Sequence, residues 1–341
     1  MSTLPKIIVH LGSSKCGTTS FQSFLRHHRE EMLEQGILKP LSTMGLINDL
    51  GLGAYLGVKA NLRRYLEVQG LEPLSHDVFQ QAFEARLLEE IAQNAPTKIV
   101  FSFEGLLPRP QDDVDTIMAL FRRISPDITI LVSLRRHDRW AVSSYNTRLV
   151  GHGTTMKDQL TNEQGRPHGM LYTRLLGHWE RHVGRENMTV FAFEDYEDVL
   201  DPYRAAIGFE PRAPWNQRQN LGISALGQEV LRRHNETAAQ VDTATEREKK
   251  ILRRALKAIL PTGAPRLPSA AAVAEHLKVF AEDREALRGS YLPAESRFFE
   301  DIRPYPETPE KITVSDAEVA DWVARARTLS HDDIMRVRSG F

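Results

Sequence analysis

The stretch KIIVHLGSSKCGTTS, residues 6–20, decides the fold of this chain. It opens with a short apolar run rich in β-branched residues, which predicts a buried strand of the kind found in parallel sheets. A polar loop bounded by Gly12 and Gly17 follows, and apolar residues then recur at helical spacing over 18–34. A strand, a glycine-bounded loop and a helix form the opening unit of a doubly wound α/β domain.

Three more apolar runs predict strands further along the chain, at 98–103, 127–134 and 188–193. Helical patterns lie between them, at about 113–123 and 136–150. Strands separated by helices favour a mainly parallel sheet with right-handed crossovers, in which ligands bind outside the carboxyl ends of the strands. The residues that we expect at that edge are therefore 12–19, Glu104, Arg135 and Glu194.

The last third of the chain has a helical pattern from about Ser224 onward. One charged helix is expected over 246–260, and Ser269 is placed to cap the next helix. Ser315 with Glu318 fits a capping box at the start of a final helix. We expect this part to form a layer packed on the sheet rather than a separate domain.

Composition restricts the classes of partner. The 341 residues are 41% hydrophobic and 26% charged, which is ordinary for a globular protein. The formal net charge of -1 gives no overall basic field for nucleic acid or an anionic membrane, so any anion site must be local. Cys16 is the only cysteine, which leaves no intrachain disulfide and suits a reducing compartment. The pattern of a secretory leader is missing, as are the ~20 consecutive apolar residues of a membrane span, so we expect a cytoplasmic protein.

The loop after the first strand has the chemistry of an anion site. Small residues let the backbone wrap around an anion, and the amides and dipole of the following helix favour negative charge there. Lys15 adds a cation, and Thr18, Thr19 and Ser20 add hydroxyl donors. A glycine turn without a ligand is the alternative, and the coincidence of strand, loop, lysine and helix argues against it.

The spacing is close to the nucleotide-binding pattern G-x-x-x-x-G-K-[ST], with one departure. Thr18 stands where that pattern has its lysine, and the lysine of this chain lies inside the loop. A magnesium-nucleotide enzyme also uses an aspartate at the end of a neighbouring strand, whereas Glu104 and Arg135 end the strands here. A sulfuryl group carries less charge than a phosphoryl group, so lysine, hydroxyls and amides could stabilise its transfer with no metal required.

Residues 10–20, HLGSSKCGTTS, resemble the 5′-phosphosulfate loop of the sulfotransferases that use 3′-phosphoadenosine-5′-phosphosulfate (PAPS), whose pattern is a lysine, one residue, then Gly-Thr-Thr. Ser20 replaces the tryptophan that is usual in cytosolic members. Serine there, with His-x-Gly before the lysine, is similar to bacterial members related to the carbohydrate sulfotransferases. The resemblance implies PAPS as donor and adenosine 3′,5′-bisphosphate as product. It implies that the phosphosulfate is bound by Ser14, Lys15, Cys16, Gly17, Thr18, Thr19 and Ser20.

Residues 135–145, RRHDRWAVSSY, resemble the 3′-phosphate signature of the same family, an arginine at a strand end and a serine eight residues later on the next helix. Arg135 and Ser143 keep this spacing, although Arg136 and His137 replace the common Asn-Pro pair. An arginine binds phosphate with directed, charge-assisted hydrogen bonds, and a serine adds a short one. A solvated basic helix start is the alternative, and the separate phosphosulfate motif upstream disfavours it.

An acceptor hydroxyl or amine must lose a proton as it attacks sulfur, which requires a base within hydrogen-bond reach. Glu104 is the leading candidate, because its sequence FSFEG is similar to the carboxylate site of carbohydrate and tyrosine sulfotransferases. Its alternative role is a charge that orders the loop 105–112. His10 is the second candidate, although a histidine at a strand end is more often structural. Lys15 is expected to bind the bridging oxygen and to stabilise the leaving phosphate.

Three other features of the sequence favour a structural role rather than a functional one. Cys16 precedes a helix N-terminus, but no partner for a nucleophilic thiol is evident, and we expect a small loop filler. His178 and His182 lie one helical turn apart without a visible third ligand, so a solvated helix face is expected and no metal site. The basic cluster 59–64 could meet an anionic acceptor, but usually such a cluster is a wet helix face.

The sequence therefore predicts an α/β, P-loop-like, three-layer fold with a central parallel sheet and a helical C-terminal layer. A single sulfotransferase domain is expected over 1–341, with the cofactor core at about 1–210 and the helical layer at about 220–341. The predicted activity is in-line transfer of a sulfuryl group from PAPS to a hydroxyl or amine of a sugar, glycolipid or small metabolite. Residues 36–95 and the helical tail are expected to shape the acceptor pocket. The alternatives are a magnesium-nucleotide-dependent small-molecule kinase and a non-catalytic nucleotide-binding protein of the same fold; the oligomeric state is not indicated.

Overall fold

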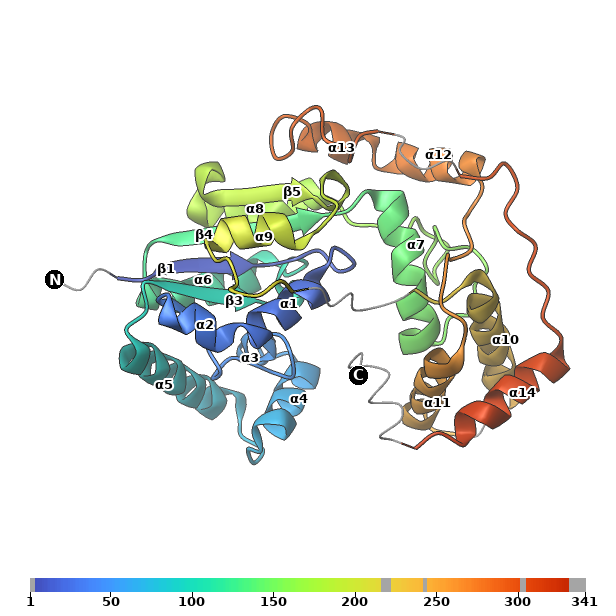
Figure 1. The fold of residues 1–341 in the computed structure, drawn as a ribbon, viewed down its shortest axis with the longest axis horizontal. Coiled ribbons are helices and arrows are strands. Elements are labelled where there is room, and N and C mark those ends of the chain that lie inside the picture. The colour runs from blue at the N-terminus through green and yellow to red at the C-terminus, as the bar shows by residue number, and fades with distance from the viewer. Residues whose placement is uncertain (1–3, 216–221, 242–243, 301–304, 331–341) are drawn as a thin grey trace. The chain divides into compact units, whose positions relative to one another are not determined.

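The chain divides into two compact units, each built from three segments (Figure 1). The sequence predicts a boundary between the cofactor core and the helical layer near 210–220. In the structure, residues 136–170 also belong with the C-terminal helices, because they make their contacts there. The first unit comprises Met1–Arg135, Leu171–Gln217 and Glu285–Phe299, and the second comprises Arg136–Met170, Arg218–Arg284 and Glu300–Phe341. The computed structural model describes residues 4–215, 222–241, 244–300 and 305–330.

The first unit contains a five-stranded sheet in which all strands are parallel, in the order β2-β3-β1-β4-β5. From β1 the chain crosses to the edge strand β2, returns to β3 beside β1 and then continues to β4 and β5 on the other side. The carboxyl end of β1 therefore lies where the direction of winding reverses. Ligands bind at such a switch point in open α/β sheets. The strands are β1 (Lys6–His10), β2 (Ile37–Leu38), β3 (Lys98–Ser102), β4 (Ile128–Leu134) and β5 (Met188–Ala192).

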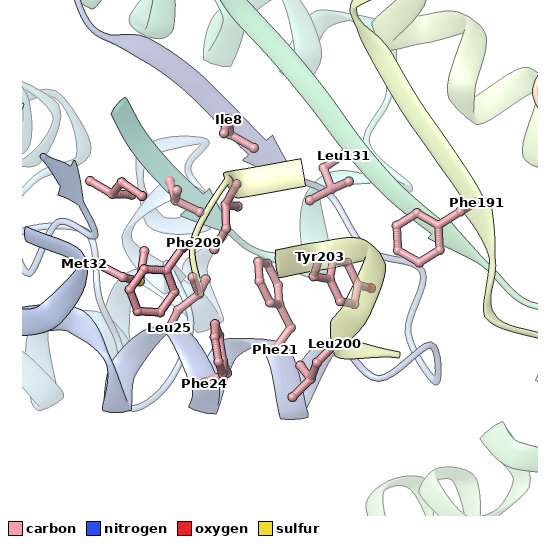
Figure 2. Close-up of a cluster of buried hydrophobic side chains, with 13 residues drawn as sticks. Ile8, Phe21, Phe24, Leu25, Met32, Leu131, Phe191, Leu200, Tyr203 and Phe209 are labelled. Atoms are coloured by element: carbon pink, nitrogen blue, oxygen red, sulfur yellow. The ribbon is translucent and has the colours of Figure 1, made fainter. Parts of the chain in front are cut away.

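Helices cover both faces of this sheet, which is consistent with a three-layer fold. On one face Ile8 and Leu131 of the strands pack against Phe21 of α1 and Tyr203 of α9 (Figure 2). On the other face Phe101 of β3 stacks on Phe121 of α6, with ring centroids 4.9 Å apart. The first face carries α1 (Thr18–His27), α2 (Arg29–Glu34) and α9 (Leu200–Ile207), and the second carries α6 (Gln111–Ile124) with α8 (Tyr172–Val183) beside it.

The four strands predicted from apolar runs are confirmed, within a residue at each end. The predicted helix over 18–34 is two helices, because the backbone leaves helical geometry at His28. The sequence pattern does not predict β2, because two residues are too few for a periodic pattern. The remaining elements of the first unit are α3 (Leu50–Tyr55), α4 (Lys59–Gln69), α5 (His76–Asn94) and the short η1 (Glu104–Leu106), η3 (Arg185–Asn187) and η4 (Phe193–Asp195).

The second unit is helical and has its own apolar core. Tyr145, Leu149 and Leu256 are among its buried members. The predicted caps are confirmed. The Ser269 side chain accepts a hydrogen bond from the amide of Ala272 at the start of its helix, and Ser315 forms a capping box with Glu318. Among the described residues, no helix is both long enough and apolar enough for a bilayer. The elements are α7 (His137–Thr147), the π-helical η2 (Arg148–His152), α10 (Ala225–Val241), α11 (Glu246–Ile259), α12 (Ala270–Val279) and α14 (Asp316–Arg327), while α13 (Ala281–Leu287) crosses the unit boundary.

Candidate functional site

The parallel strands bring the predicted residues of the first unit to one edge of the sheet. The loop 11–17 leaves β1 between β3 and β4, and the hydrogen bonds of the central strand with both neighbours continue up to the start of the loop. The amide of Leu11 donates to the carbonyl of Leu131 (3.0 Å), and the amide of Phe103 donates to the carbonyl of His10 (3.1 Å). The same edge carries Glu104 after β3, Arg135 after β4 and Glu194 after β5.

The loop enters the left-handed backbone region three times. Gly12 has φ 53°, Lys15 has φ 70° and Gly17 has φ 74°. A Cβ on Gly12 would lie 2.6 Å from Thr18 Cγ2, and one on Gly17 would lie 2.4 Å from Val199 Cγ1, so both positions need glycine for space as well as for conformation. Lys15 is the one position of the three that is not glycine. A residue with a side chain in the left-handed backbone region costs about 1–2 kcal/mol relative to the right-handed one.

The start of α1 completes a cradle of backbone donors. Gly17 is the N-cap residue, and no side chain caps the helix. The amides of Thr18, Thr19 and Ser20 therefore have no partner inside the helix, and the helix dipole favours an anion beside them. No acidic residue occupies the first turn, and Thr18 itself is buried. The half-buried residues, which a ligand could touch, are Ser14, Lys15, Gly17, Thr19 and Ser20.

Arg135 contacts the loop directly. Its Nη1 donates to the carbonyl of Lys15 at 2.7 Å, and its guanidinium carbon lies 4.7 Å from the centre of the Phe193 ring. The hydroxyl of Tyr172 donates to the carbonyl of Arg135 at 2.8 Å, which fixes the end of β4. The lysine-bearing loop and the arginine thus form one cationic feature. Ser143 lies half-buried on α7 of the second unit, so its pairing with Arg135 stays a prediction.

The residue after Arg135 has a structural role within the second unit. The side chain of Arg136 is buried and donates twice to Asp138, from Nε (2.7 Å) and Nη2 (2.8 Å). Tyr305 donates its hydroxyl to the same carboxylate at 2.6 Å. Burial raises the pKa of Asp138, but the hydrogen bonds and charge of Arg136 outweigh it and hold that pKa below its ordinary value. The first turn of α7 is therefore a buried ion pair, not a solvated basic segment.

His10 lies beneath the loop and is fully buried. Its Nδ1 is 2.7 Å from Ser102 Oγ, and its ring meets Phe21 and Tyr203 edge-on. Its Nε2 has no hydrogen-bond partner among the described residues and faces the start of the loop, since a Cβ on Gly12 would lie 2.9 Å from it. Burial lowers the pKa of His10 to about 3, so the ring is neutral. Because a base must reach the proton that it removes, this enclosure favours the structural role of His10.

Cys16 is also fully buried within the loop. Burial raises the pKa of its thiol to about 12, which keeps the sulfur protonated at neutral pH. A nucleophilic cysteine has the opposite property, a lowered thiol pKa and an exposed sulfur. Its environment is that of the expected loop filler, and its backbone is what it offers to a ligand.

Glu104 is connected to α1 by Gln22, which no sequence motif singled out. The side-chain amide of Gln22 donates to the Glu104 carboxylate at 2.6 Å. Gln22 is buried, whereas Glu104 is half-buried and begins η1 at the edge of the sheet. Because Gln22 lies one helical turn after Thr18, the carboxylate is tied to the helix whose first turn forms the cradle. The sequence places this glutamine on the helix face shared by Thr18, but it does not show which residue the glutamine contacts.

Two further groups of polar residues show ordinary structural contacts. His178 Nδ1 lies 3.1 Å from the carbonyl of Arg109, and His182 Nε2 lies 2.8 Å from the Asp115 carboxylate. Within the described ranges, no group of three or more His, Cys, Asp or Glu is arranged to hold a metal. In the basic cluster 59–64, the two arginines lie on an exposed face of α4 and pair with Glu67.

The site can thus present a lysine, an arginine and a row of backbone amides to an anion, with a carboxylate held at the same edge. Such donors are suited to stabilising negative charge that develops on a leaving group. Comparison of the chain with protein-family models, with curated proteins and with solved structures gave no match.

Proposed function

We propose that the chain is a PAPS-dependent sulfotransferase with a P-loop-like fold. The proposal is supported by the position of the loop, at the carboxyl end of the central strand, where the direction of winding reverses. It is supported equally by the strand–loop–helix sequence HLGSSKCGTTS, in which the lysine precedes the second glycine.

The observation that carries the proposal is the backbone of Lys15. Its φ of 70° suits glycine, and glycine is what the loop has at the two other left-handed positions. A lysine that retains an unfavourable conformation is best explained by what its side chain does. A cation inside an anion-binding loop, together with Arg135 on the Lys15 carbonyl, fits a donor that carries charge at two separate groups.

Each residue then has a defined task. The backbone of 14–20 binds the 5′-phosphosulfate, and Arg135 with Ser143 binds the 3′-phosphate. PAPS supplies the sulfuryl group, and the acceptor oxygen or nitrogen forms the new bond to sulfur as the bond from sulfur to the bridging oxygen breaks. Glu104 takes the proton of the acceptor, and Gln22 holds the carboxylate toward the cradle. Lys15 stabilises the charge that appears on the departing phosphate, so no metal is required.

We further propose that the acceptor is a small molecule or carbohydrate with a free hydroxyl or amine. The net charge of -1 gives no general attraction for a polyanion such as nucleic acid. Residues 36–95 and the helical tail, which hold none of the donor motifs, remain the predicted source of the acceptor pocket.

Binding calorimetry tests the donor against the competing kinase function. We expect the protein to bind adenosine 3′,5′-bisphosphate with EDTA present and to bind ATP with magnesium much more weakly. Tight ATP binding that depends on magnesium would instead favour the kinase. Binding of the bisphosphate without turnover of labelled PAPS, over a broad acceptor screen, would favour the non-catalytic alternative.

Glu104→Gln tests the base once an acceptor is found. We expect kcat to fall by about 10²–10⁴-fold, because general base catalysis is lost, while the affinity for adenosine 3′,5′-bisphosphate stays the same. Glu72→Gln is the matched control, since Glu72 is an exposed carboxylate of the same unit. Full turnover by Glu104→Gln would remove Glu104 from the mechanism.

A further inference from the structure

Two successive carbonyl groups of the loop are held from the protein side. The carbonyl of Lys15 accepts from Arg135, as described above. The carbonyl of Cys16 lies within hydrogen-bond distance of two hydroxyls, Ser133 Oγ at 3.3 Å and Tyr203 Oη at 3.2 Å. These hydroxyls also hydrogen-bond to one another, and all these groups belong to the first unit.

The direction of these carbonyls fixes the direction of the neighbouring amides. In a trans peptide the C=O and the following N–H point in opposite directions. Because the carbonyl of Lys15 faces Arg135 and that of Cys16 faces the buried Ser133 and Tyr203 hydroxyls, the N–H groups of Cys16 and Gly17 point away from these side chains. The left-handed backbone at Lys15 and Gly17 is the conformation that aims successive amides into one concavity.

We propose that Tyr203 and Ser133 are positioning residues that hold the Cys16 carbonyl inward and thereby aim the loop amides at the bound anion. The proposal rests on the proposed function for the identity of that anion. It adds α9 and β4 to the elements that set the geometry of the site, through side chains that never touch the ligand.

The environment of Tyr203 suits this role. The phenol is fully buried, and its ring stacks on Phe21, with ring centroids 4.3 Å apart, and meets Phe191 edge-on. Burial raises the pKa of Tyr203 above its ordinary value, so the hydroxyl keeps its proton. Tyr203→Phe would therefore remove one donor and leave the packing of the ring intact.

The two hydroxyls can substitute for one another. They make three contacts with two protons, so either hydroxyl can donate to the Cys16 carbonyl when the other is removed. We therefore expect Tyr203→Phe or Ser133→Ala alone to weaken anion binding by about threefold. The double variant, which leaves that carbonyl without a donor, should weaken binding by about 30-fold or more, beyond the product of the single effects.

The control is another buried tyrosine of the same unit. Tyr65 is 1% exposed, and its hydroxyl donates to the carbonyl of Ser42, remote from the loop in sequence. Tyr65→Phe thus removes the same group from the same kind of bond. It should lower the melting temperature at least as much as Tyr203→Phe does and leave anion binding unchanged.

The experiment measures the dissociation constants of adenosine 3′,5′-bisphosphate and of inorganic pyrophosphate by calorimetry for the wild type and the four variants. Amide NMR spectra recorded during the pyrophosphate titration follow Cys16 and Gly17. We expect both amides to shift on binding in the wild type and to shift less in the double variant. A purely structural role would change the melting temperature without changing either readout.

The outcomes separate this proposal from the proposed function. If pyrophosphate binds but the bisphosphate does not, the donor is wrong, and the pyrophosphate data still support positioning when the double variant binds it more weakly. If the double variant binds pyrophosphate as tightly as Tyr65→Phe does, the positioning role is overturned. It is overturned also if the wild type binds neither anion, since there is then no anion to position.

Discussion

Lys15 combines a requirement of the site with a disadvantage for the fold. Its backbone is left-handed, as at Gly12 and Gly17, yet it carries a long side chain. Ala95 is the only other described residue besides glycine with positive φ, and it lies at the C-terminal end of α5. Unfavourable backbone conformations concentrate at functional sites because the surrounding structure can hold them in place.

Lys15→Gly should make the protein more stable and less active. Relief of the left-handed conformation exceeds the added chain entropy of glycine by about 0.5–1 kcal/mol. Ala95→Gly should stabilise by a similar amount with activity unchanged. Chemical denaturation and PAPS turnover measure the two effects. A Lys15→Gly variant that is both destabilised and fully active would contradict this account of the loop.

His10 should make stability depend on pH in the acidic range. Burial lowers the pKa of His10 from 6.5 to about 3, so between these values the unfolded chain binds a proton that the folded chain does not. Stability therefore falls as the pH falls below about 6.5, by an amount on the order of a few kcal/mol at pH 4. We expect the His10→Asn variant to lose less stability than the wild type between pH 7 and pH 4. If the free energy of unfolding of the two proteins falls by the same amount between pH 7 and pH 4, His10 is not the cause of the pH dependence.

At the scale of elements, buried polar contacts align the ends of the strands that carry the site. Asp49, at the start of α3, accepts from the backbone amide of Ser102 at the end of β3 and pairs with Lys39, which follows β2. Ser102 in turn contacts His10 at the end of β1. The side chains of Lys39 and Asp49 are fully buried, and burial lowers the pKa of Lys39 although Asp49 opposes this.

Lys39→Met should strongly destabilise the first unit. The substitution leaves the Asp49 carboxylate buried without its counter-ion, which costs about 3–5 kcal/mol. Lys6→Met is the control, because Lys6 and Asp127 form an exposed pair 3.8 Å apart, worth about 0–1 kcal/mol. Urea denaturation compares the two. Equal effects would show that the buried pair adds nothing beyond a surface contact.

At the scale of the whole molecule, the chain forms two compact units that are interleaved in sequence. Each unit takes three segments, so the chain passes from one to the other after residues 135, 170, 217, 284 and 299. Each also has its own buried apolar cluster, around Phe21 in the first and around Leu256 in the second. Units with separate cores need not unfold together.

Differential scanning calorimetry should therefore resolve two transitions. Leu256→Ala empties part of the second core, at a cost of about 2–5 kcal/mol, and should lower one transition only. Lys39→Met should lower the other transition. If both variants shift one common transition, the units unfold as a single cooperative body.

The sequence by itself determined the α/β class, four of the five strands and the caps of the later helices, because apolar periodicity, glycine and capping residues act locally. It also located the loop 12–17, because small residues between a predicted strand and a predicted helix form a pattern that is local in sequence. It could not supply Gln22 on Glu104, Arg135 on the Lys15 carbonyl, or Tyr203 and Ser133 on the Cys16 carbonyl. Those contacts join residues that are 82 or more positions apart, so only the packing of the sheet and its helices decided them.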